Sequence, residues 1–212
     1  MGGLSPTLLM NNTGILILAA GGSSRLGRPK QLLLWKGKTL VSHVATEAVA
    51  AGLSPVVVVT GAFAGEVRAA LAGGALSGLP VKIVDNPRWK EGMASSITTG
   101  LTYLLASQPG LTAVVIAVCD QPFVSAALFA ALVERHVATG TSVVASAYAG
   151  SVGTPVLFAA SQFPALLALA GDAGAKKIIL QRDTALVDFP EGGLDIDTDA
   201  AYAELLARGS GQ

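Results

Sequence analysis

GILILAAGGSSRLGRPK, residues 14–30, joins an apolar run to a loop of small residues with two spaced cations. The apolar part, Ile15 to Ala20, does not alternate with polar residues, which is typical of a strand buried on both faces. The glycines and serines that follow leave backbone N–H groups bare and let an anion approach closely. Arg25 and Lys30 supply charge for phosphate oxygens. The segment therefore predicts a phosphate-binding loop after a buried strand, and the competing interpretation is a tight connection with two solvated cations.

Two common nucleotide-binding motifs are missing from this segment. It contains neither the Walker pattern, GxxxxGK followed by Ser or Thr, nor the dinucleotide fingerprint GxGxxG. Pro29 disfavours helical backbone at Arg28, so we expect the loop to stay extended through Lys30. A long loop that wraps a triphosphate fits this sequence better than a helix end that caps one.

The composition bounds the class of protein. With 212 residues, of which 51% are hydrophobic and 13% charged, the chain can bury a large core in one α/β domain. A formal net charge of zero argues against nucleic acid or an anionic membrane as the main partner. The single cysteine, Cys119, excludes an internal disulfide and fits a reducing, cytoplasmic setting. Residues 1–12 lack the features of a secretory signal, and no apolar run is long enough to span a bilayer.

Strands and helices alternate along the chain. We expect strands at residues 14–20, 55–60, 81–84, 112–118, 142–148, 151–159 and 185–189, and helices at residues 39–51, 64–71, 97–106, 126–138, 162–169, 174–181 and 199–207. This order predicts an α/β fold of three layers, Rossmann-like, with a mostly parallel mixed sheet flanked by helices. The turn at Ala149–Gly150 predicts at least one antiparallel pair. We expect an N-terminal tail at residues 1–13 and a single domain at residues 14–208.

Asp120 is the first candidate metal ligand. It directly follows a buried strand, and sites in doubly wound sheets form beyond the carboxyl ends of the strands. Mg²⁺ binds a few carboxylates together with substrate phosphates, so a carboxylate at this point could hold it beside a triphosphate. The alternative is an N-terminal helix cap or a turn former, because Pro122 begins a turn.

A second acidic segment, residues 193–199 with the sequence GLDIDTD, lies late in the chain. In extended backbone Asp195 and Asp197 point to the same side, and close carboxylates repel unless a proton or a cation separates them. The alternative is that Asp197 or Thr198 caps the last helix.

The segment 86–96, NPRWKEGMASS, is less specific. Gly92, Ser95 and Ser96 could contact a nucleotide, or they could form a helix start with serine as the cap, and the two interpretations have similar weight. Trp89 in this segment is more typical of a core or rim residue than of a platform on which a base stacks.

Taken together, these segments resemble the MobA/MocA-type nucleotidyltransferases. Their signature, L-A-(A/G)-G-x-S-x-R-M-G-x-x-K, matches Leu18 to Lys30, with Leu26 in place of methionine. Ala20 gives LAAG rather than LAGG, which is similar to molybdenum cofactor cytidylyltransferases. The resemblance implies the nucleotidyltransferase fold and places Arg25 and Lys30 on the phosphates. The nucleotide-binding residues that it implies in this loop are Leu18, Ala19, Ala20, Gly21, Gly22, Ser23, Arg25 and Lys30.

The acidic segments resemble the metal motifs of the same family. CDQP at residues 119–122 is similar to its D-x-P motif, which implies that Asp120 binds Mg²⁺. DIDTD at residues 195–199 is similar to its D-x-D-T-P ending, with an aspartate in place of the proline. Asp197 is the favoured second ligand with Asp195 in support, although either could bind. The G-M-x-x-S segment of the family, near the base and phosphates, implies binding roles for Gly92, Ser95 and Ser96.

Two further segments resemble the family and are implied to lie on the acceptor side. Residues 153–158 are similar to G-x-P-x-L-F, with Thr154 where His is frequent. Residues 171–176 are similar to G-D-x-G-A-R, with Lys176 replacing Arg. Without the resemblance they read as a strand and a glycine turn, in which Asp172 could cap the following helix.

The resemblance implies Mg²⁺-dependent transfer of a nucleotidyl group, CMP from CTP favoured, to a phosphate acceptor, with Arg25, Lys30 and Asp120 as catalytic residues. The implied acceptor is molybdopterin-type molybdenum cofactor, and a client molybdoenzyme is a possible partner. Alternatives are a guanylyltransferase, a sugar- or alcohol-phosphate nucleotidyltransferase, or a non-catalytic nucleotide-binding maturation factor for molybdoenzymes. The missing fingerprint disfavours a Rossmann-type oxidoreductase. Cys119 is expected to be a buried small residue rather than a nucleophile.

Overall fold

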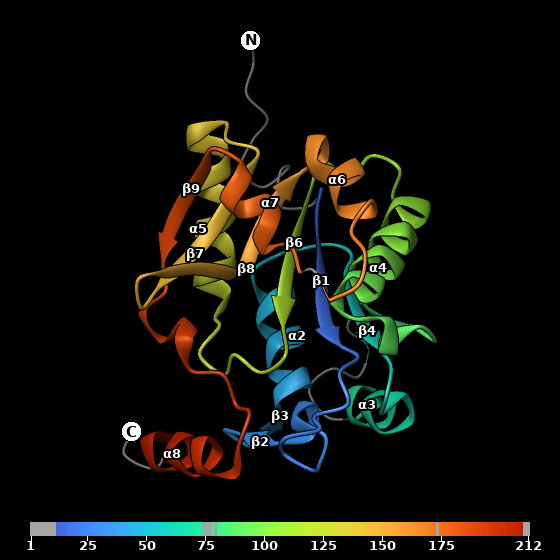
Figure 1. The fold of residues 1–212 in the computed structure, drawn as a ribbon, viewed down its shortest axis with the longest axis vertical. Coiled ribbons are helices and arrows are strands. Elements are labelled where there is room, and N and C mark those ends of the chain that lie inside the picture. The colour runs from blue at the N-terminus through green and yellow to red at the C-terminus, as the bar shows by residue number, and fades with distance from the viewer. Residues whose placement is uncertain (1–11, 74–77, 79, 173, 210–212) are drawn as a thin grey trace.

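A computed structural model describes residues 12–73, 78, 80–172 and 174–209 (Figure 1). Most of the expected N-terminal tail, residues 1–11, lies outside the described residues. The first strand, β1 (Thr13–Ala19), begins one residue before the predicted start and is buried along its whole length. None of the helices in the described part of the chain is long and apolar enough to cross a membrane.

Seven strands form one mixed sheet, in the order β5-β4-β1-β6-β8-β7-β9. All neighbouring strands are parallel except that β8 is antiparallel to both β6 and β7. The predicted mostly parallel sheet with one antiparallel hairpin is therefore confirmed. The strands after β1 are β4 (Val56–Thr60), β5 (Val81–Asp85), β6 (Ala113–Val118), β7 (Val143–Tyr148), β8 (Ser151–Ala159) and β9 (Thr184–Asp188).

Helices cover both faces of this sheet, which gives the three layers that the sequence predicts (Figure 1). Successive side chains of β1 point to opposite faces, so Ile15 and Ile17 join one core while Leu16 and Leu18 join the other. The first core is completed by α2 (Leu40–Ala50), α3 (Ala64–Ala72) and α5 (Ala126–Thr139). The second is completed by α4 (Met93–Ser107), α6 (Phe163–Leu167) and α7 (Lys176–Gln181).

Two helices begin after a residue whose side chain caps them, and a third does not. Thr39 caps α2 and Ser125 caps α5, because each side chain accepts a backbone N–H of the first turn. The α4 helix begins at Met93, four residues before the predicted start at Ile97. It follows Gly92, whose φ of 101° ends the preceding 3-10 turn, and no side chain caps it.

A short hairpin that the sequence analysis did not predict lies beyond the carboxyl ends of β1 and β6 (Figure 1). It pairs β2 (Leu34–Trp35) with β3 (Lys38–Thr39). Lys36 and Gly37 connect them with φ of 48° and 75°, the left-handed backbone that two-residue hairpins require. The 3-10 segments of the chain are η1 (Lys30–Leu32), η3 (Trp89–Glu91), η4 (Ala160–Gln162) and η5 (Pro190–Gly193).

The last helix, α8 (Asp199–Gly209), packs against this hairpin. The Tyr202 hydroxyl accepts the N–H of Leu34 at 3.2 Å and donates to its carbonyl at 3.0 Å. Arg28, from the glycine loop, pairs with Asp199 at 2.5 Å and lies over the Tyr202 ring. The C-terminal helix is therefore attached to the same loop that follows β1.

Candidate active site

The glycine loop turns back on itself instead of staying extended. The N–H groups of Leu26 and Gly27 both donate to the carbonyl of Ser23 at 3.1 Å. Ser23 adopts a φ of 49°, which starts the turn. Only Pro29 keeps the extended backbone that we expected, and a 3-10 turn begins directly after it. The loop is therefore a compact turn around bare N–H groups rather than an open strand.

Gln31 holds this loop in place, and the sequence analysis missed it. Its side chain is 1% exposed, and Nε2 donates to the carbonyls of Ala19 at 3.0 Å and Gly21 at 2.7 Å. The Ser23 hydroxyl donates to Oε1 at 3.3 Å and accepts the N–H of Lys30 at 3.1 Å. These bonds fix the shape of the loop from Ala19 to Lys30 through its carbonyls and the Ser23 hydroxyl. The available signal was a polar residue at the start of the apolar run 31–35.

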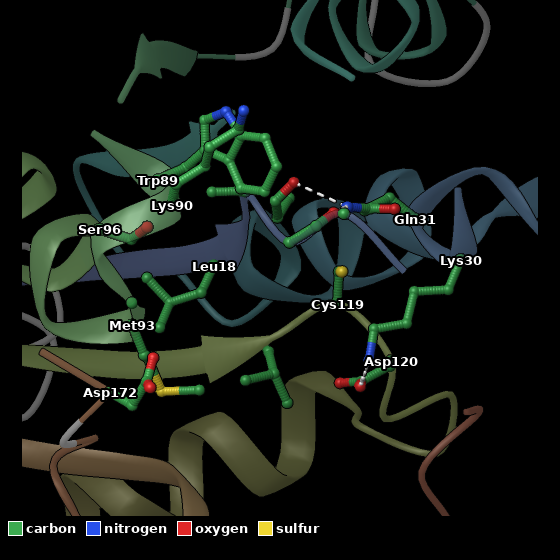
Figure 2. Close-up of a pocket in the computed structure, with 16 residues that line it drawn as sticks. Leu18, Lys30, Gln31, Trp89, Lys90, Met93, Ser96, Cys119, Asp120 and Asp172 are labelled. Carbon is green, nitrogen blue, oxygen red and sulfur yellow. Dashed lines mark hydrogen bonds and ion pairs between the residues drawn. The ribbon is translucent and has the colours of Figure 1, made fainter. Parts of the chain in front are cut away.

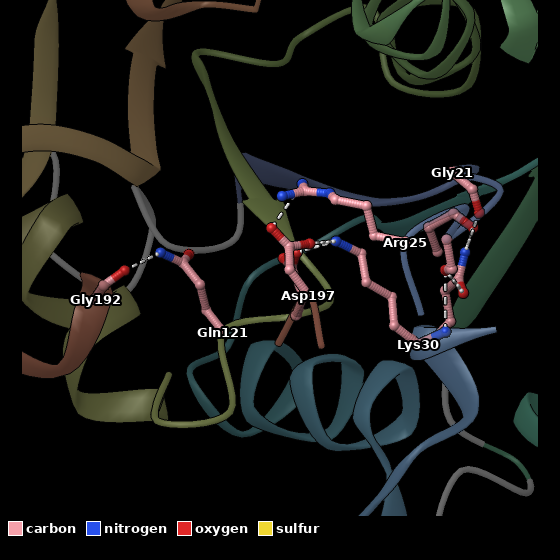
Figure 3. A network of polar contacts seen from close by, with 10 residues as sticks. Gly21, Arg25, Lys30, Gln121, Gly192 and Asp197 are labelled. Atoms are coloured by element: carbon pink, nitrogen blue, oxygen red, sulfur yellow. Dashed lines mark hydrogen bonds and ion pairs between the residues drawn. The ribbon is translucent and has the colours of Figure 1, made fainter. Parts of the chain in front are cut away.

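Lys30 brings the two acidic segments together (Figure 3). Its Nζ pairs with Asp120 Oδ2 and lies 3.2 Å from Asp197 Oδ1. The Arg25 guanidinium pairs with the other oxygen of Asp197 at 2.7 Å and is largely exposed. Burial alone would lower the pKa of Lys30, but the Asp120 and Asp197 carboxylates outweigh it and raise that pKa above its ordinary value. Two carboxylates thus converge on one cationic position.

This donor set fits a divalent cation shared with a nucleotide. In the part of the chain that the structure describes, no three His, Cys, Asp or Glu side chains gather with metal-ligand geometry. Mg²⁺ characteristically takes one or two carboxylates and completes its shell with substrate phosphates and water, which matches Asp120 and Asp197. Partial burial raises the pKa of the neighbouring Asp195 to about 6, and the Asp120 carboxylate adds to that rise.

A cavity of about 440 Å³ opens beside the end of β1 (Figure 2). It extends from the Lys30–Asp120 pair at one end to Trp89, Ser96 and Asp172 at the other. The predicted site residues that line it are Leu18, Ala19, Ala20, Gly21, Gly22, Lys30, Gly92, Ser96 and Asp120. The strand, the glycine loop and the segment before α4 therefore line one cavity, as the motifs predict.

Three other predicted residues lie around a neighbouring hollow. Ser23, Arg25 and Asp197 line a cavity of about 160 Å³ that shares Gly21 and Lys30 with the larger one. The glycine loop thus separates two connected spaces, with the two cations and the second carboxylate at their junction.

Ser95 and Asp195 do not reach the large cavity. The Ser95 hydroxyl lies 2.8 Å from the carbonyl of Gly92, inside the first turn of α4, so it is neither a helix cap nor a cavity residue. Asp195 lines a separate small hollow beside Phe123. Asn86 was not predicted, yet its buried amide donates to the hydroxyls of both Ser95 and Ser96, at 2.8 and 3.0 Å.

The rim of the cavity is formed by Trp89, as the sequence analysis expected. A Cβ on Gly61 would lie only 2.7 Å from both the Cβ of Trp89 and the carbonyl oxygen of Ala20, so glycine permits this close approach. Cys119 also lines the cavity. Burial raises the pKa of its thiol above the ordinary value, so it stays protonated and is a poor nucleophile, as predicted.

The two segments assigned to the acceptor side separate in the structure. Gln121 Nε2 donates to the carbonyl of Thr154 at 3.1 Å and to that of Gly192 at 2.8 Å (Figure 3), and the acceptor role of Thr154 stays a prediction. Asp172, in contrast, lines the large cavity with the glycine loop. The turn at residues 171–172 packs on the start of α4, so Asp172 shares the cavity of the glycine loop, which Thr154 does not line.

A mixed seven-stranded sheet with an anion-binding loop after β1 and a carboxylate at the end of β6 is the arrangement of a Rossmann-like nucleotidyltransferase. Comparison with known families agrees with this class. The model of the MobA-like NTP transferase domain matches residues 15–185, and the chain belongs to that family.

Named relatives extend the comparison. The chain is 35% identical over 206 residues to a protein named nicotine blue oxidoreductase from Paenarthrobacter nicotinovorans, covering 92% of this chain and 96% of that protein. It is 34% identical over 121 residues to a probable molybdenum cofactor guanylyltransferase from Bacillus cereus, covering 57% of this chain and 54% of that protein. The Rv0371c protein of Mycobacterium tuberculosis H37Rv, solved in complex with manganese, aligns with a TM-score of 0.70 at 30% identity, over 92% of this chain and 97% of that one.

Proposed function

We propose that this protein transfers a nucleotidyl group from a nucleoside triphosphate, with CTP favoured, to the phosphate of a molybdopterin-type molybdenum cofactor, releasing pyrophosphate. The convergence of Asp120 and Asp197 on one cationic position at the end of the 440 Å³ cavity carries the proposal. Ala20, which gives the LAAG form of the signature, favours cytosine. The manganese in the M. tuberculosis relative supports a divalent metal, and we propose Mg²⁺.

Each group of the site has a task in this reaction. The backbone N–H groups of Gly21 and Gly22, which line the cavity, bind the triphosphate, and Gln31 holds the loop in shape through its bonds to the carbonyls of Ala19 and Gly21. Asp120 and Asp197 hold the divalent cation, which when bound supplies positive charge at the α-phosphate. Such positioning and charge neutralisation are the main requirements of phosphoryl chemistry.

Lys30 and Arg25 act on the leaving group. Both cations line the hollow that adjoins the large cavity, so they are placed to neutralise pyrophosphate as its charge develops. An acceptor phosphate is already an anion at neutral pH, so the reaction needs no general base. The resemblance of residues 153–158 to the family supports an acceptor site near Thr154, whose carbonyl accepts from Gln121, the residue next to Asp120.

Three other functions compete with this one. A guanylyltransferase or another phosphate-specific nucleotidyltransferase of the same fold would use the same residues with a different base or acceptor. The relative named as an oxidoreductase supports the second, a reductase that binds a dinucleotide in the same cavity, although the GxGxxG fingerprint is missing from residues 14–30. A maturation factor that hands cofactor to a client molybdoenzyme would bind nucleotide without turnover.

A panel assay separates these functions. The protein is incubated with Mg²⁺, each of the four nucleoside triphosphates and molybdenum cofactor, and pyrophosphate and dinucleotide product are measured; a parallel arm follows NADH oxidation. We expect pyrophosphate release with CTP and cofactor together. Tight nucleotide binding without turnover would exclude the transferase, and NADH oxidation without pyrophosphate would favour the reductase.

Asp120→Asn tests the mechanism in the same assay. Removing one carboxylate from the cation site should lower turnover by about a hundredfold or more, while the far-ultraviolet circular dichroism spectrum stays unchanged. Asp188→Asn, at the exposed end of β9, is the matched control and should keep full turnover. An Asp120→Asn variant that remains active would remove this residue from the mechanism.

A further inference from the structure

Asp172 is placed in the large cavity by contacts to the start of α4. The carbonyl of Gly171 accepts the N–H of Ala94 at 3.3 Å. A Cβ on Gly92 would lie 2.5 Å from both that carbonyl oxygen and Asp172 Oδ1. Gly171 and Gly92 both have positive φ, 65° and 101°. The carboxylate is therefore held directly over the backbone of Gly92, one residue before the helix.

In the described part of the chain, the Asp172 carboxylate neither caps a helix nor pairs with a cation. The helix that follows, α7, has Ala175 as its N-cap with no side-chain cap bond, so the expectation that Asp172 caps it is wrong. Among the described residues, no lysine, arginine or histidine forms an ion pair with Asp172. An exposed aspartate that faces a cavity and neutralises no cation is available to a ligand.

The position of Asp172 in the cavity indicates which part of a ligand it meets. Lys30 and Asp120 lie at one end of the cavity, and Asp172 lies with Ser96 and Met93 at the other (Figure 2). A triphosphate at the cationic end leaves the base at the far end. A carboxylate there would repel phosphate, whereas it can accept hydrogen bonds from a base.

We propose that Asp172 selects the base of the nucleotide by accepting a hydrogen bond from its exocyclic amino group. The assignment rests on the proposed nucleotidyl transfer and adds a specificity-determining residue to it. Cytosine carries an amino donor where uracil and thymine carry a carbonyl oxygen. A carboxylate has no proton to donate, so it attracts the amino group and repels the carbonyl.

Ser96 supplies the complementary group. The N–H of Arg88 donates to Asn86 Oδ1 at 3.0 Å, which orients the amide so that its Nδ2 donates to Ser96 Oγ at 3.0 Å. The Ser96 hydroxyl accepts that bond and keeps its own proton for an acceptor in the cavity. An acceptor at Asp172 and a donor at Ser96 match a base edge that carries an amino group and a ring carbonyl or nitrogen, as cytosine does.

The test measures nucleotide binding without any acceptor. Isothermal titration with CTP, GTP, ATP, UTP and inorganic triphosphate is run on the wild-type protein, on Asp172→Asn and Asp172→Ala, and on Asp183→Asn as a matched exposed control. We expect wild type to bind CTP more tightly than UTP. Loss of a hydrogen bond to a charged group corresponds to about a tenfold to hundredfold loss of CTP affinity in both Asp172 variants.

The pattern across ligands distinguishes base selection from a general effect. An asparagine can donate to a carbonyl, so Asp172→Asn should also bind UTP at least as well as wild type does. Affinity for inorganic triphosphate should stay within about twofold in every variant, because that ligand has no base. A CTP-to-UTP ratio that is unchanged in both Asp172 variants would overturn the assignment while leaving nucleotidyl transfer intact. Failure of wild type to bind any nucleotide would overturn the proposed function as well.

Discussion

Replacing Lys30 by methionine tests whether its ammonium group acts as the counter-ion of the two carboxylates when no metal is bound. Methionine keeps the length and apolar stem of the side chain but removes the charge that Asp120 and Asp197 share. Without it, two carboxylates face one another, and their repulsion should destabilise the folded protein. The variant should therefore unfold more easily than wild type in metal-free buffer.

The exposure of the three groups sets the magnitude. Their side chains are 21%, 12% and 31% exposed for Lys30, Asp120 and Asp197, so the network is neither fully buried nor a surface pair. Breaking a buried pair costs about 3–5 kcal/mol and a surface pair about 0–1 kcal/mol. We expect a loss of about 1–2 kcal/mol, which for a chain of this length lowers Tm by roughly 2–8 °C.

Mn²⁺ should stabilise the Lys30→Met variant more than it stabilises wild type. In wild type a divalent cation must displace the Lys30 ammonium group from the two carboxylates. In Lys30→Met no ammonium group competes with the cation. Thermal unfolding with increasing Mn²⁺ and no nucleotide should therefore raise Tm more in the variant, because tighter binding to the folded state stabilises it more. Lys82→Met, on the exposed side of β5, is the control and should follow wild type. If Lys30→Met has the same Tm as wild type, and Mn²⁺ raises its Tm by no more than that of wild type, the counter-ion argument is refuted.

Two further predictions concern stability away from the site, and urea unfolding measures both. Burial lowers the pKa of His43 below its ordinary 6.5. As pH falls, His43 is therefore protonated in the unfolded chain before it is protonated in the folded protein, so the free energy of unfolding decreases as pH falls from about 6.5. His43→Gln should flatten the decline between pH 6.5 and 5, and an unchanged slope would contradict this. Gly100→Ala places a Cβ 2.7 Å from Val59 Cγ2 and 2.8 Å from Leu16 Cδ2, so overpacking should lower the free energy of unfolding by about 1–3 kcal/mol. The higher helix propensity of alanine offsets up to about 1 kcal/mol of this loss. Gly65→Ala, in open space on α3, should instead stabilise the protein, and equal effects of the two alanines would refute the packing argument.

The parts of the fold that were predictable are those that local patterns determine. The uninterrupted apolar run from Ile15 to Ala20 can be buried only between two layers, and the structure places it between two cores. Asp120 was predictable for the same reason, because a carboxylate directly after such a strand reaches the edge where the loops gather. Ser125 follows the rule for helix caps and does cap α5.

The missed features depend on backbone geometry or on distant partners. Gly92 adopts a positive φ, which lets α4 begin early and moves Ser95 inside the helix, and its sequence context does not reveal this. The β2–β3 hairpin turns at Lys36–Gly37, and only Gly37 indicates it in the sequence, because the strong signals for a two-residue turn are Asn-Gly and Asp-Gly. The place of Asp172 follows only from how its turn packs on α4.

The ion pairs of Lys30 join parts of the chain that are synthesised at very different times. Asp120 follows Lys30 by 90 residues and Asp197 follows it by 167. A growing chain therefore carries the complete glycine loop, without a carboxylate partner for Lys30, until Asp120 has been made. The central strands can pair before the second carboxylate exists, since β1, β4 and β6 all precede it. A nascent chain can thus present an anion site well before it can hold a metal, because the second carboxylate lies just before the last helix, α8.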